Sequence, residues 1–538
     1  MNRSAAATPT SRGGRRGGFG SVLALQLRTG WVRLLVWIVS LVGVYAATLS
    51  AISNLYPDDA ALESYGATLD GDPTVAAING TPYGATDLGG VAANEYAFIA
   101  AIAVPLMGLF LVVAQTRAQE ESGLLELLRS RSIGARAPWL AAFLVTVVAF
   151  LAVGLGIFAA ALAGGVDAGA VGLYALSISA LGIFFAALAT FVGQFVRRGS
   201  GVTSVGVGVL GMAFVTRAIG DVNDDGWKWL SPLAWQQETR PFDTDPRWWP
   251  LALTLGVAAV LAVAGLVLVA RRDLGASLFA ARPGPARAGG FARSSFGLAL
   301  RSHAPSIVAW VLGALLVGVA FGSFGDDVEE MVEANPQLGE LLGTGGASDQ
   351  YTAVVLLLVA LMALGVVGQG VGRVRAEESS GRIEPVLARG TSRMPWLGLQ
   401  GGVVAVGGVL TLVLGGFGLS LSTPSDGGGS AGWDVVLASI DYVPAVLAVA
   451  GLGVLVLGLL PRTTWLVWLV VAYIALVGML GGTLDLPDWA MSLSPLYAIG
   501  QVPAESASGW AVVWLSVIAV VLFVGGLVAF RERDVPRT

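Results

Sequence analysis

The 538-residue sequence is too apolar and too poor in charge for a soluble globular protein. Hydrophobic residues make up 55% of it, charged residues make up 12%, and the mean hydropathy is +0.75, whereas charged residues are about a quarter of a typical soluble domain. Cysteine is absent and His303 is the single histidine, which excludes disulfides, thiolate catalysis and a histidine-rich metal site. Many windows reach the roughly 20 apolar residues that cross a bilayer. The sequence therefore predicts an all-α polytopic membrane protein.

Residues 1–20 are rich in glycine, serine and arginine and contain no apolar core. This composition predicts a disordered basic cytosolic tail and not a signal peptide. Residues 21–33 predict an amphipathic helix on the cytosolic membrane surface. Twelve membrane spans are expected at about 34–55, 96–115, 139–163, 169–195, 201–219, 249–270, 305–323, 351–371, 397–421, 434–460, 463–481 and 510–530.

The last six spans repeat the first six. LRTGWVRLLVW at Leu27–Trp37 resembles LRSHAPSIVAW at Leu300–Trp310, and LSPLAW at Leu230–Trp235 resembles LSPLYA at Leu493–Ala498. ARRD follows the sixth span, and the similar RERD follows the twelfth. Because both halves begin on the same side of the membrane, the repeat is a parallel duplication and not an inverted one. We expect a six-helix half over 21–275, a cytosolic linker over 276–295 and a second six-helix half over 296–538.

The distribution of charge predicts that both termini are cytosolic. An excess of arginine and lysine in short loops marks the cytosolic side of a membrane protein. With the termini inside, all but four of the 31 basic residues fall in cytosolic segments, and all but nine of the 36 acidic residues fall outside. The four exceptions are Arg217, Lys228, Arg240 and Arg247. We therefore expect a multi-pass protein. Thirty arginines against one lysine, with abundant alanine, glycine and valine, are typical of a high-GC bacterial genome, so the expected location is a bacterial plasma membrane.

A charged segment after the second span occurs again after the eighth. Residues 117–139 read RAQEESGLLELLRSRSIGARAPW, and residues 375–396 read RAEESSGRIEPVLARGTSRMPW. A polar segment that is copied while the apolar sequence around it has diverged indicates a function, and two related loops that only terminate helices are the alternative. The aligned pairs are Arg117 with Arg375, Glu120 with Glu378, Gly123 with Gly381, Glu126 with Glu384, Arg131 with Arg389, and Trp139 with Trp396.

The first copy predicts a short amphipathic helix. Glu120, Gly123 and Leu124 would share one helical face, and the order of glutamates before arginines suits the helix dipole. Two such helices about a pseudo-twofold axis would fit two equivalent clefts of a symmetric partner.

Nucleotide hydrolysis by this chain is excluded. A Walker A loop requires a lysine that reaches the phosphates, and the only lysine, Lys228, lies in the external sequence DDGWKWL. Ion coupling within the spans has two candidate residues, Asp434 and Asp441, which lie on one face of the tenth span and are our candidates for a substrate pathway. An aspartate near the positive end of a helix is the simpler interpretation of both.

A membrane enzyme that acts on lipid-linked substrates would require carboxylates able to hold a divalent cation. The sequence offers three external acidic pairs, which solvated loops also explain: Asp58 with Asp59, Asp224 with Asp225, and Asp326 with Asp327. This enzyme and an ion-driven secondary transporter are the two rival classes of function.

The pattern EESGxxE with an arginine-rich turn and Pro-Trp, after the second of six spans, resembles the coupling segment of ABC-2-type export permeases (the type V exporter fold). The tandem six-span halves, with LSPL before the last span of each, resemble the fused actinobacterial permeases called exporters of polyketide antibiotics, or tetronasin-type permeases. This resemblance covers nearly the whole chain. It implies twelve helices in two tandem ABC-2-type halves, a substrate pathway between the halves, and multidrug, polyketide antibiotic or lipid export that can confer antibiotic resistance.

The resemblance also implies the partners. A separate, homodimeric ATP-binding-cassette subunit would bind ATP and Mg²⁺, and this chain would bind no cofactor and no nucleic acid, only membrane lipids and a hydrophobic small molecule. Two departures, Ser379 in place of Glu121 and Pro385 in place of Leu127, could break the second helix and make the docking sites unequal. The residues that would couple to the ATPase are Glu120, Glu121, Gly123, Glu126, Arg131, Glu377, Glu378, Gly381, Glu384 and Arg389.

Overall fold

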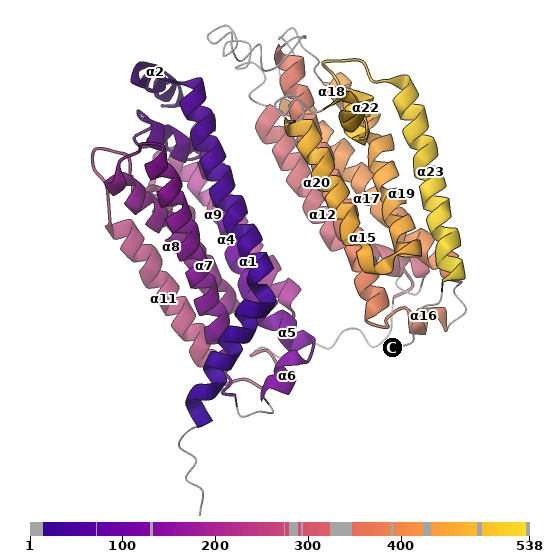
Figure 1. Ribbon diagram of the computed structural model, residues 1–538, viewed down its shortest axis with the longest axis horizontal. Helices are drawn as coiled ribbons and strands as arrows, with labels where there is room; N and C mark the ends of the chain where they lie inside the picture. Colours follow the sequence, from indigo (N-terminus) through magenta and orange to yellow (C-terminus); the bar gives the residue numbers. More distant parts are fainter. Residues whose placement is uncertain are drawn as a thin grey trace, which may run out of the picture. The chain divides into compact units, whose positions relative to one another are not determined.

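The computed structural model is helical throughout the part of the chain that it describes, with no strand in that part (Figure 1). The described residues are 14–70, 73–129, 133–273, 275–278, 289–291, 294–322, 347–388, 392–422, 432–480 and 487–533. The chain divides into two compact units, Met1–Pro283 and Gly284–Thr538, which are described separately. The division falls within the segment that the sequence marks as a linker.

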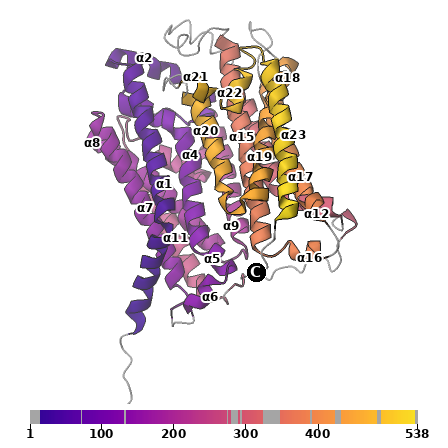
Figure 2. The same ribbon diagram turned by 45° about the vertical axis from the view of Figure 1, so that its right-hand side comes forward.

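Unit 1 is a bundle of long helices with short helices at both ends. Figures 1 and 2 show α2 at one end of this bundle and α5 and α6 at the other. The long helices are α1 (Gly14–Leu55), α4 (Leu88–Gln115), α7 (Ala137–Ala163), α8 (Ala168–Val192), α9 (Gly199–Val222) and α11 (Trp249–Val269). The short ones are α2 (Asp59–Leu69), α3 (Pro73–Ile78), α5 (Arg117–Glu121), α6 (Leu124–Arg129), η1 (Gly226–Leu230) and α10 (Pro232–Gln237).

Unit 2 has the same plan. Its short helix α16 lies at one end of the bundle, and α18 and α22 lie at the other (Figures 1 and 2). The long helices are α12 (Ser295–Gly322), α15 (Ala347–Ser379), α17 (Arg393–Ser422), α19 (Val443–Leu459), α20 (Trp465–Leu480) and α23 (Gly509–Glu532). The short ones are α16 (Glu384–Leu387), α18 (Trp433–Asp441), η3 (Pro461–Thr463), α21 (Asp488–Met491) and α22 (Pro495–Ile499).

The helices of the two units pack in matching pairs. In unit 1, α1 packs on α7 and α8 packs on α11, while α4 contacts α1, α7, α8 and α9. In unit 2, α12 packs on α17 and α19 packs on α23, while α15 contacts α12, α17, α19 and α20. Each unit has its own apolar core around its second long helix. Two tandem copies of one helix arrangement account for the repeats seen in the sequence.

Eleven described helices are long and apolar enough to cross a membrane. The exception among the twelve expected spans is 463–481, where α20 has 16 residues; at 1.5 Å per residue it is about 24 Å long, less than the roughly 30 Å of hydrocarbon. The span expected at 434–460 is divided at Tyr442 into α18 and α19.

The N-terminal prediction is wrong in two respects. Helix α1 is one continuous helix of 42 residues, so the amphipathic stretch 21–33 is not a separate helix but runs without a break into the first span. The helix also begins at Gly14, inside the tail that was predicted to be disordered. Once a helix is nucleated, each added residue gains a hydrogen bond at little further cost, so α1 extends into the tail. Residues 1–13 lie outside the described part of the chain.

Glycines allow close approach between two helices of unit 2, α19 and α23. A Cβ on Gly526 in α23 would lie 2.5 Å from the carbonyl carbon of Val454 in α19, and a Cβ on Gly458 would lie 2.4 Å from the oxygen of Gly526. Backbones in contact increase dispersion attraction, which drives helix association in a bilayer, where apolar lipid removes the hydrophobic driving force. The contact between α19 and α23 therefore depends on these glycines.

Candidate functional site

The first repeated segment is two short helices joined by a turn, not one helix. Helix α5 ends at Glu121, and Gly123 has a φ of +76°, a left-handed conformation that glycine adopts without strain. The turn is fixed by hydrogen bonds from Gly123 N to Glu120 O (3.2 Å) and from Glu126 N to Gly123 O (3.1 Å). The prediction that Glu120, Gly123 and Leu124 share a face of one helix is therefore wrong, because the chain changes direction at Gly123.

The second repeated segment has the same turn. Gly381 has a φ of +69°, its N–H donates to Glu378 O (3.1 Å), and Glu384 N donates to Gly381 O (3.2 Å). Pro385 does not cause this break, because it lies in the first turn of α16, where a proline lacks no needed hydrogen bond. The two segments thus share a helix end, a glycine turn and a second short helix.

Glu120 is buried at the centre of a charged cluster. Its side chain is 2% exposed and forms ion pairs with Arg117 (2.7 Å) and Arg272 (2.7 Å). Trp139 Nε1 also donates to Glu120 Oε1 (3.1 Å). Glu120 is therefore almost entirely covered by its neighbours among the described residues, and its contact with an ATPase subunit stays a prediction.

Glu378 occupies the equivalent position in unit 2. Its side chain is 3% exposed and forms ion pairs with Arg375 (3.2 Å) and Arg533. Trp396, the counterpart of Trp139 in the repeat, is buried and stacks on Phe530, with ring centroids 5.9 Å apart, and Arg533 lies over the Phe530 ring. A buried glutamate between two arginines thus occurs in both units.

The segments keep other acidic residues on their surfaces. Glu126 and Glu384 are both exposed and aligned in the repeat. The Glu121 carboxylate accepts a hydrogen bond from Gly199 N at the start of α9, where the helix dipole favours negative charge. At the position that corresponds to Glu121, the hydroxyl of Ser379 donates to Ala376 O (3.3 Å), so only the first segment has a carboxylate of this kind.

Glu377 is fixed by neighbouring helices. Its carboxylate accepts hydrogen bonds from Ser302 Oγ (2.6 Å) and Gln400 Nε2 (3.5 Å).

Arg131 and Arg389 lie outside the described residues. Asp434 is exposed in the first turn of α18, and Asp441 is half-buried at its end, so their place on a substrate pathway stays a prediction. Among the described residues, no cluster of His, Cys, Asp or Glu could hold a metal ion.

Comparison with known proteins extends over nearly the whole chain. Residues 41–233 match the family model described as ABC-2 family transporter protein, and residues 293–531 match that of the multidrug efflux system permease Rv1217c, C-terminal domain. The multidrug efflux system permease protein Rv1217c of Mycobacterium tuberculosis (strain ATCC 25618 / H37Rv) is 32% identical over 531 residues, 96% of this chain and 94% of that protein. The chain belongs to the ABC-2 family of transporter permeases. It is a multi-pass membrane protein and a transport subunit, and permeases of this type work with an ATPase subunit.

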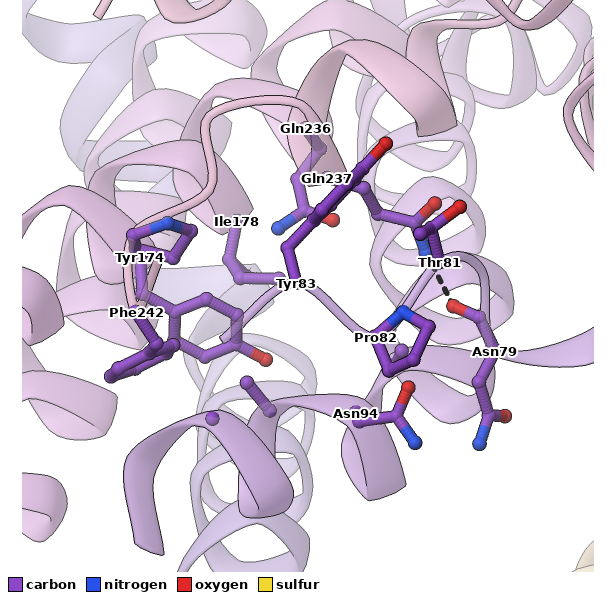
Figure 3. Close-up of a pocket in the computed structure, with 14 residues that line it drawn as sticks. Asn79, Thr81, Pro82, Tyr83, Asn94, Tyr174, Ile178, Gln236, Gln237 and Phe242 are labelled. Carbon is purple, nitrogen blue, oxygen red and sulfur yellow. Dashed lines mark hydrogen bonds between the residues drawn. The ribbon is translucent and has the colours of Figure 1, made fainter. Parts of the chain in front are cut away.

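In this permease, unit 1 has a small cavity at its α2 end. Its volume is about 50 Å³, far below the roughly 300 Å³ of a pocket for a drug-sized ligand. Figure 3 shows the Tyr174 side chain of α8 and the Asn94 side chain of α4 at this cavity, with Gln236 and Gln237 of α10 above them. The lining contains hydrogen-bonding groups but no charged side chain, so the cavity suits a small neutral group and not a whole multidrug substrate.

The same end of unit 1 also contains a buried carboxylate, Glu238. Its side chain is 2% exposed and pairs with Lys228 (3.0 Å), Arg240 (2.9 Å) and Arg247 (3.2 Å). The Tyr83 hydroxyl donates to Glu238 Oε1 (2.7 Å), and Arg240 lies 3.8 Å above the Tyr83 ring. Burial alone would raise the pKa of Glu238, but the hydrogen bonds from Tyr83 and Lys228 outweigh it and hold this pKa below its ordinary value.

Sequence reasoning assigned Arg217 to an external loop and missed its place. Its side chain is fully buried in α9, and its Nη2 donates to the carbonyls of Ala77 (2.7 Å) and Ile78 (2.8 Å) at the end of α3. An arginine in an otherwise apolar span is the signal that could have identified it, since such a charge persists only with partners.

Proposed function

We propose that this chain is the transmembrane subunit of an ATP-binding-cassette exporter that moves hydrophobic or amphipathic compounds out of the cell. The observation that carries the proposal is the full-length relationship to a multidrug efflux permease. Long apolar helices with few charges offer contact area to drugs, polyketide antibiotics or lipids, but no ion-pairing site. ATP and Mg²⁺ are bound by the partner, because this chain has no Walker A lysine.

The proposed arrangement is twelve spans in two tandem, parallel six-helix halves with both termini in the cytosol. The matching helix pairs of the two units support the duplication, and the charge distribution supports the orientation. In this arrangement α20 is the eleventh span in chain order and is shorter than the others, and the turns at Gly123 and Gly381 both face the cytosol.

The homodimeric ATPase docks on the two repeated segments. Their glycine turns are alike, and each presents an exposed glutamate at the aligned position, Glu126 or Glu384. Two similar sites in one chain are what a symmetric dimer requires. Because Glu120 and Glu378 are buried, the docking contacts come from the exposed residues, and the buried pair fixes the shape of each segment.

We expect reversal of both exposed charges, Glu126→Arg with Glu384→Arg, to stop the permease from co-purifying with the ATP-binding-cassette subunit expressed beside it. Each substitution replaces attraction with repulsion at a proposed contact, and like charges across an interface cost several kcal/mol. The measurement is the ratio of ATPase to permease after affinity purification in detergent.

The matched control is Glu63→Arg with Asp488→Arg, which reverses one exposed acidic residue in α2 and one in α21. These residues lie on the proposed outer side, so the control should keep the ATPase. If the Glu126 and Glu384 double variant inserts in the membrane and retains the ATPase as well as the control does, the docking assignment is refuted.

A further inference from the structure

The final helix of each unit carries an arginine that reaches the repeated segment. Arg272 follows α11 and Arg533 follows α23, and these are the corresponding arginines of the ARRD and RERD sequences. Arg272 pairs with Glu120, 152 residues away, and Arg533 pairs with Glu378, 155 residues away. The repeated sequences ARRD and RERD therefore form the same long-range contact, from arginine to glutamate, in both units.

The contact in unit 1 is buried and bidentate. Arg272 Nη2 donates to Glu120 Oε1 (2.7 Å), and Arg272 Nη1 donates to Glu120 Oε2 (3.1 Å). The side chains are 3% and 2% exposed. Two parallel charge-assisted hydrogen bonds fix both the distance and the orientation of the two groups, so the segment and the end of α11 are held as one piece.

Each contact also includes the end of the helix that packs on the final one. In unit 1, Arg117 Nε donates to Gly193 O (2.6 Å) and Arg272 Nε donates to Gln194 Oε1 (2.7 Å), both just after α8. In unit 2, Arg533 Nη1 donates to Leu457 O (3.1 Å) near the end of α19. The same helix pairs, α8 with α11 and α19 with α23, are among the most extensively packed pairs of each unit.

We propose that Arg272 and Arg533 are positioning residues that transmit movement of each repeated segment to the final helix pair of its unit. This inference rests on the proposed function, in which the ATPase displaces those segments. Without the arginine, the segment remains attached through its own helix, α5 or the end of α15, but its displacement no longer moves α11 or α23. Docking is then retained while transport is uncoupled from ATP hydrolysis.

The test is Arg272→Gln with Arg533→Gln, in the full permease co-expressed with its ATP-binding-cassette subunit. We expect the ATPase to co-purify as with wild type, and the amount of hydrophobic fluorescent dye transported per ATP hydrolysed to fall about tenfold, a typical size for a coupling between sites. The matched control is Arg271→Gln with Arg531→Gln, the exposed arginines of the same two sequences, and it should transport as wild type does.

A purely structural role would lower thermal stability without changing dye transported per ATP. If the double glutamine variant does not fold, Arg272→Lys with Arg533→Lys keeps the positive charge but cannot form the two parallel hydrogen bonds of a guanidinium. We expect this variant to fold and to show an intermediate fall in dye transported per ATP. Variants that fold, bind ATPase and transport as much dye per ATP as wild type would overturn the inference. A wild-type permease that binds no ATPase would overturn the proposed function, and this inference with it.

The absence of cysteine permits a second measurement on the same molecule. Spin labels on Ser122→Cys and Arg271→Cys, both exposed positions, report the distance between the first segment and the end of α11. We expect one narrow distance distribution with and without ATP, and a broad one in Arg272→Gln. An equally narrow distribution in Arg272→Gln would show that the arginine does not hold the two parts together.

Discussion

Replacement of Glu238 by alanine is expected to lower the free energy of unfolding by about 3–5 kcal/mol, the usual cost of removing one partner from a buried ion pair. The carboxylate is shared by Lys228, Arg240 and Arg247. Its removal leaves three positive charges close together, of which Lys228 is 10% exposed. The measurement is equilibrium unfolding of the purified permease in mixed micelles.

Asp245→Ala is the matched control in the same loop. Asp245 pairs with Arg247 at 3.4 Å, but its side chain is 76% exposed, and exposed pairs contribute about 0–1 kcal/mol. The two alanine variants should therefore differ clearly in stability. Equal stability would show that Glu238 does not hold this end of unit 1 together.

The same cluster predicts how stability depends on pH. The pKa of Glu238 is lower in the folded protein than its ordinary value, so its contribution is present at neutral pH and is lost as the pH falls through that lowered pKa. Burial alone would lower the pKa of Lys228, but the hydrogen bond to Glu238 and its charge hold this pKa above its ordinary value. The contribution of Lys228 is thus complete below its ordinary pKa and is lost only as the pH rises through the raised one.

The second large effect is expected from Gly526→Ala, which should destabilise unit 2 by about 1–3 kcal/mol, as overpacking does in other cores. The new Cβ would lie 2.5 Å from the carbonyl carbon of Val454 and 2.6 Å from the amide nitrogen of Leu455. Both are backbone atoms, which cannot rotate away, so α23 must move away from α19. Because α23 positions Arg533, we also expect less dye transport per ATP.

Gly525→Ala provides the neighbouring control. A Cβ there would meet only Leu455 Cδ1 at 3.6 Å, an ordinary contact, and alanine favours a helix more than glycine does. This variant should be as stable as wild type or more so in thermal unfolding. If Gly526→Ala behaves in the same way, the close packing of α19 and α23 is not what fixes the position of Arg533.

The helices and their repeat could be predicted from sequence because both depend on local patterns. Apolar length predicts the spans, and the copied segments identify Glu120 with Glu378 and Gly123 with Gly381. The helix through Gly123 was predicted wrongly, because amphipathic spacing assumes one straight helix and does not reveal a left-handed glycine. Alignment of Gly123 with Gly381 contained that signal, since a glycine retained in both copies of a turn suits a positive φ.

The long-range contacts could not be predicted in the same way. The sequence showed ARRD and RERD as a repeat, but not that Arg272 meets Glu120, because that contact depends on how α8 packs on α11. Glu238 likewise counted only as an external acidic residue, since its three cations come together through the fold of η1 and of the loop between α10 and α11. Burial of a charge is decided by tertiary packing, which spacing along the chain does not encode.

In the proposed function this permease does not hydrolyse ATP and transports only when an ATPase acts on it. The most direct measurement is uptake of a hydrophobic fluorescent dye into vesicles that contain the purified chain, with and without the ATP-binding-cassette subunit and ATP, at zero ion gradient and under an imposed proton or sodium gradient. We predict accumulation against a gradient only when the subunit and ATP are both present, and no effect of an uncoupler. Accumulation by the chain alone under an ion gradient would show that the permease is an ion-driven transporter and not the subunit of an ATP-driven exporter.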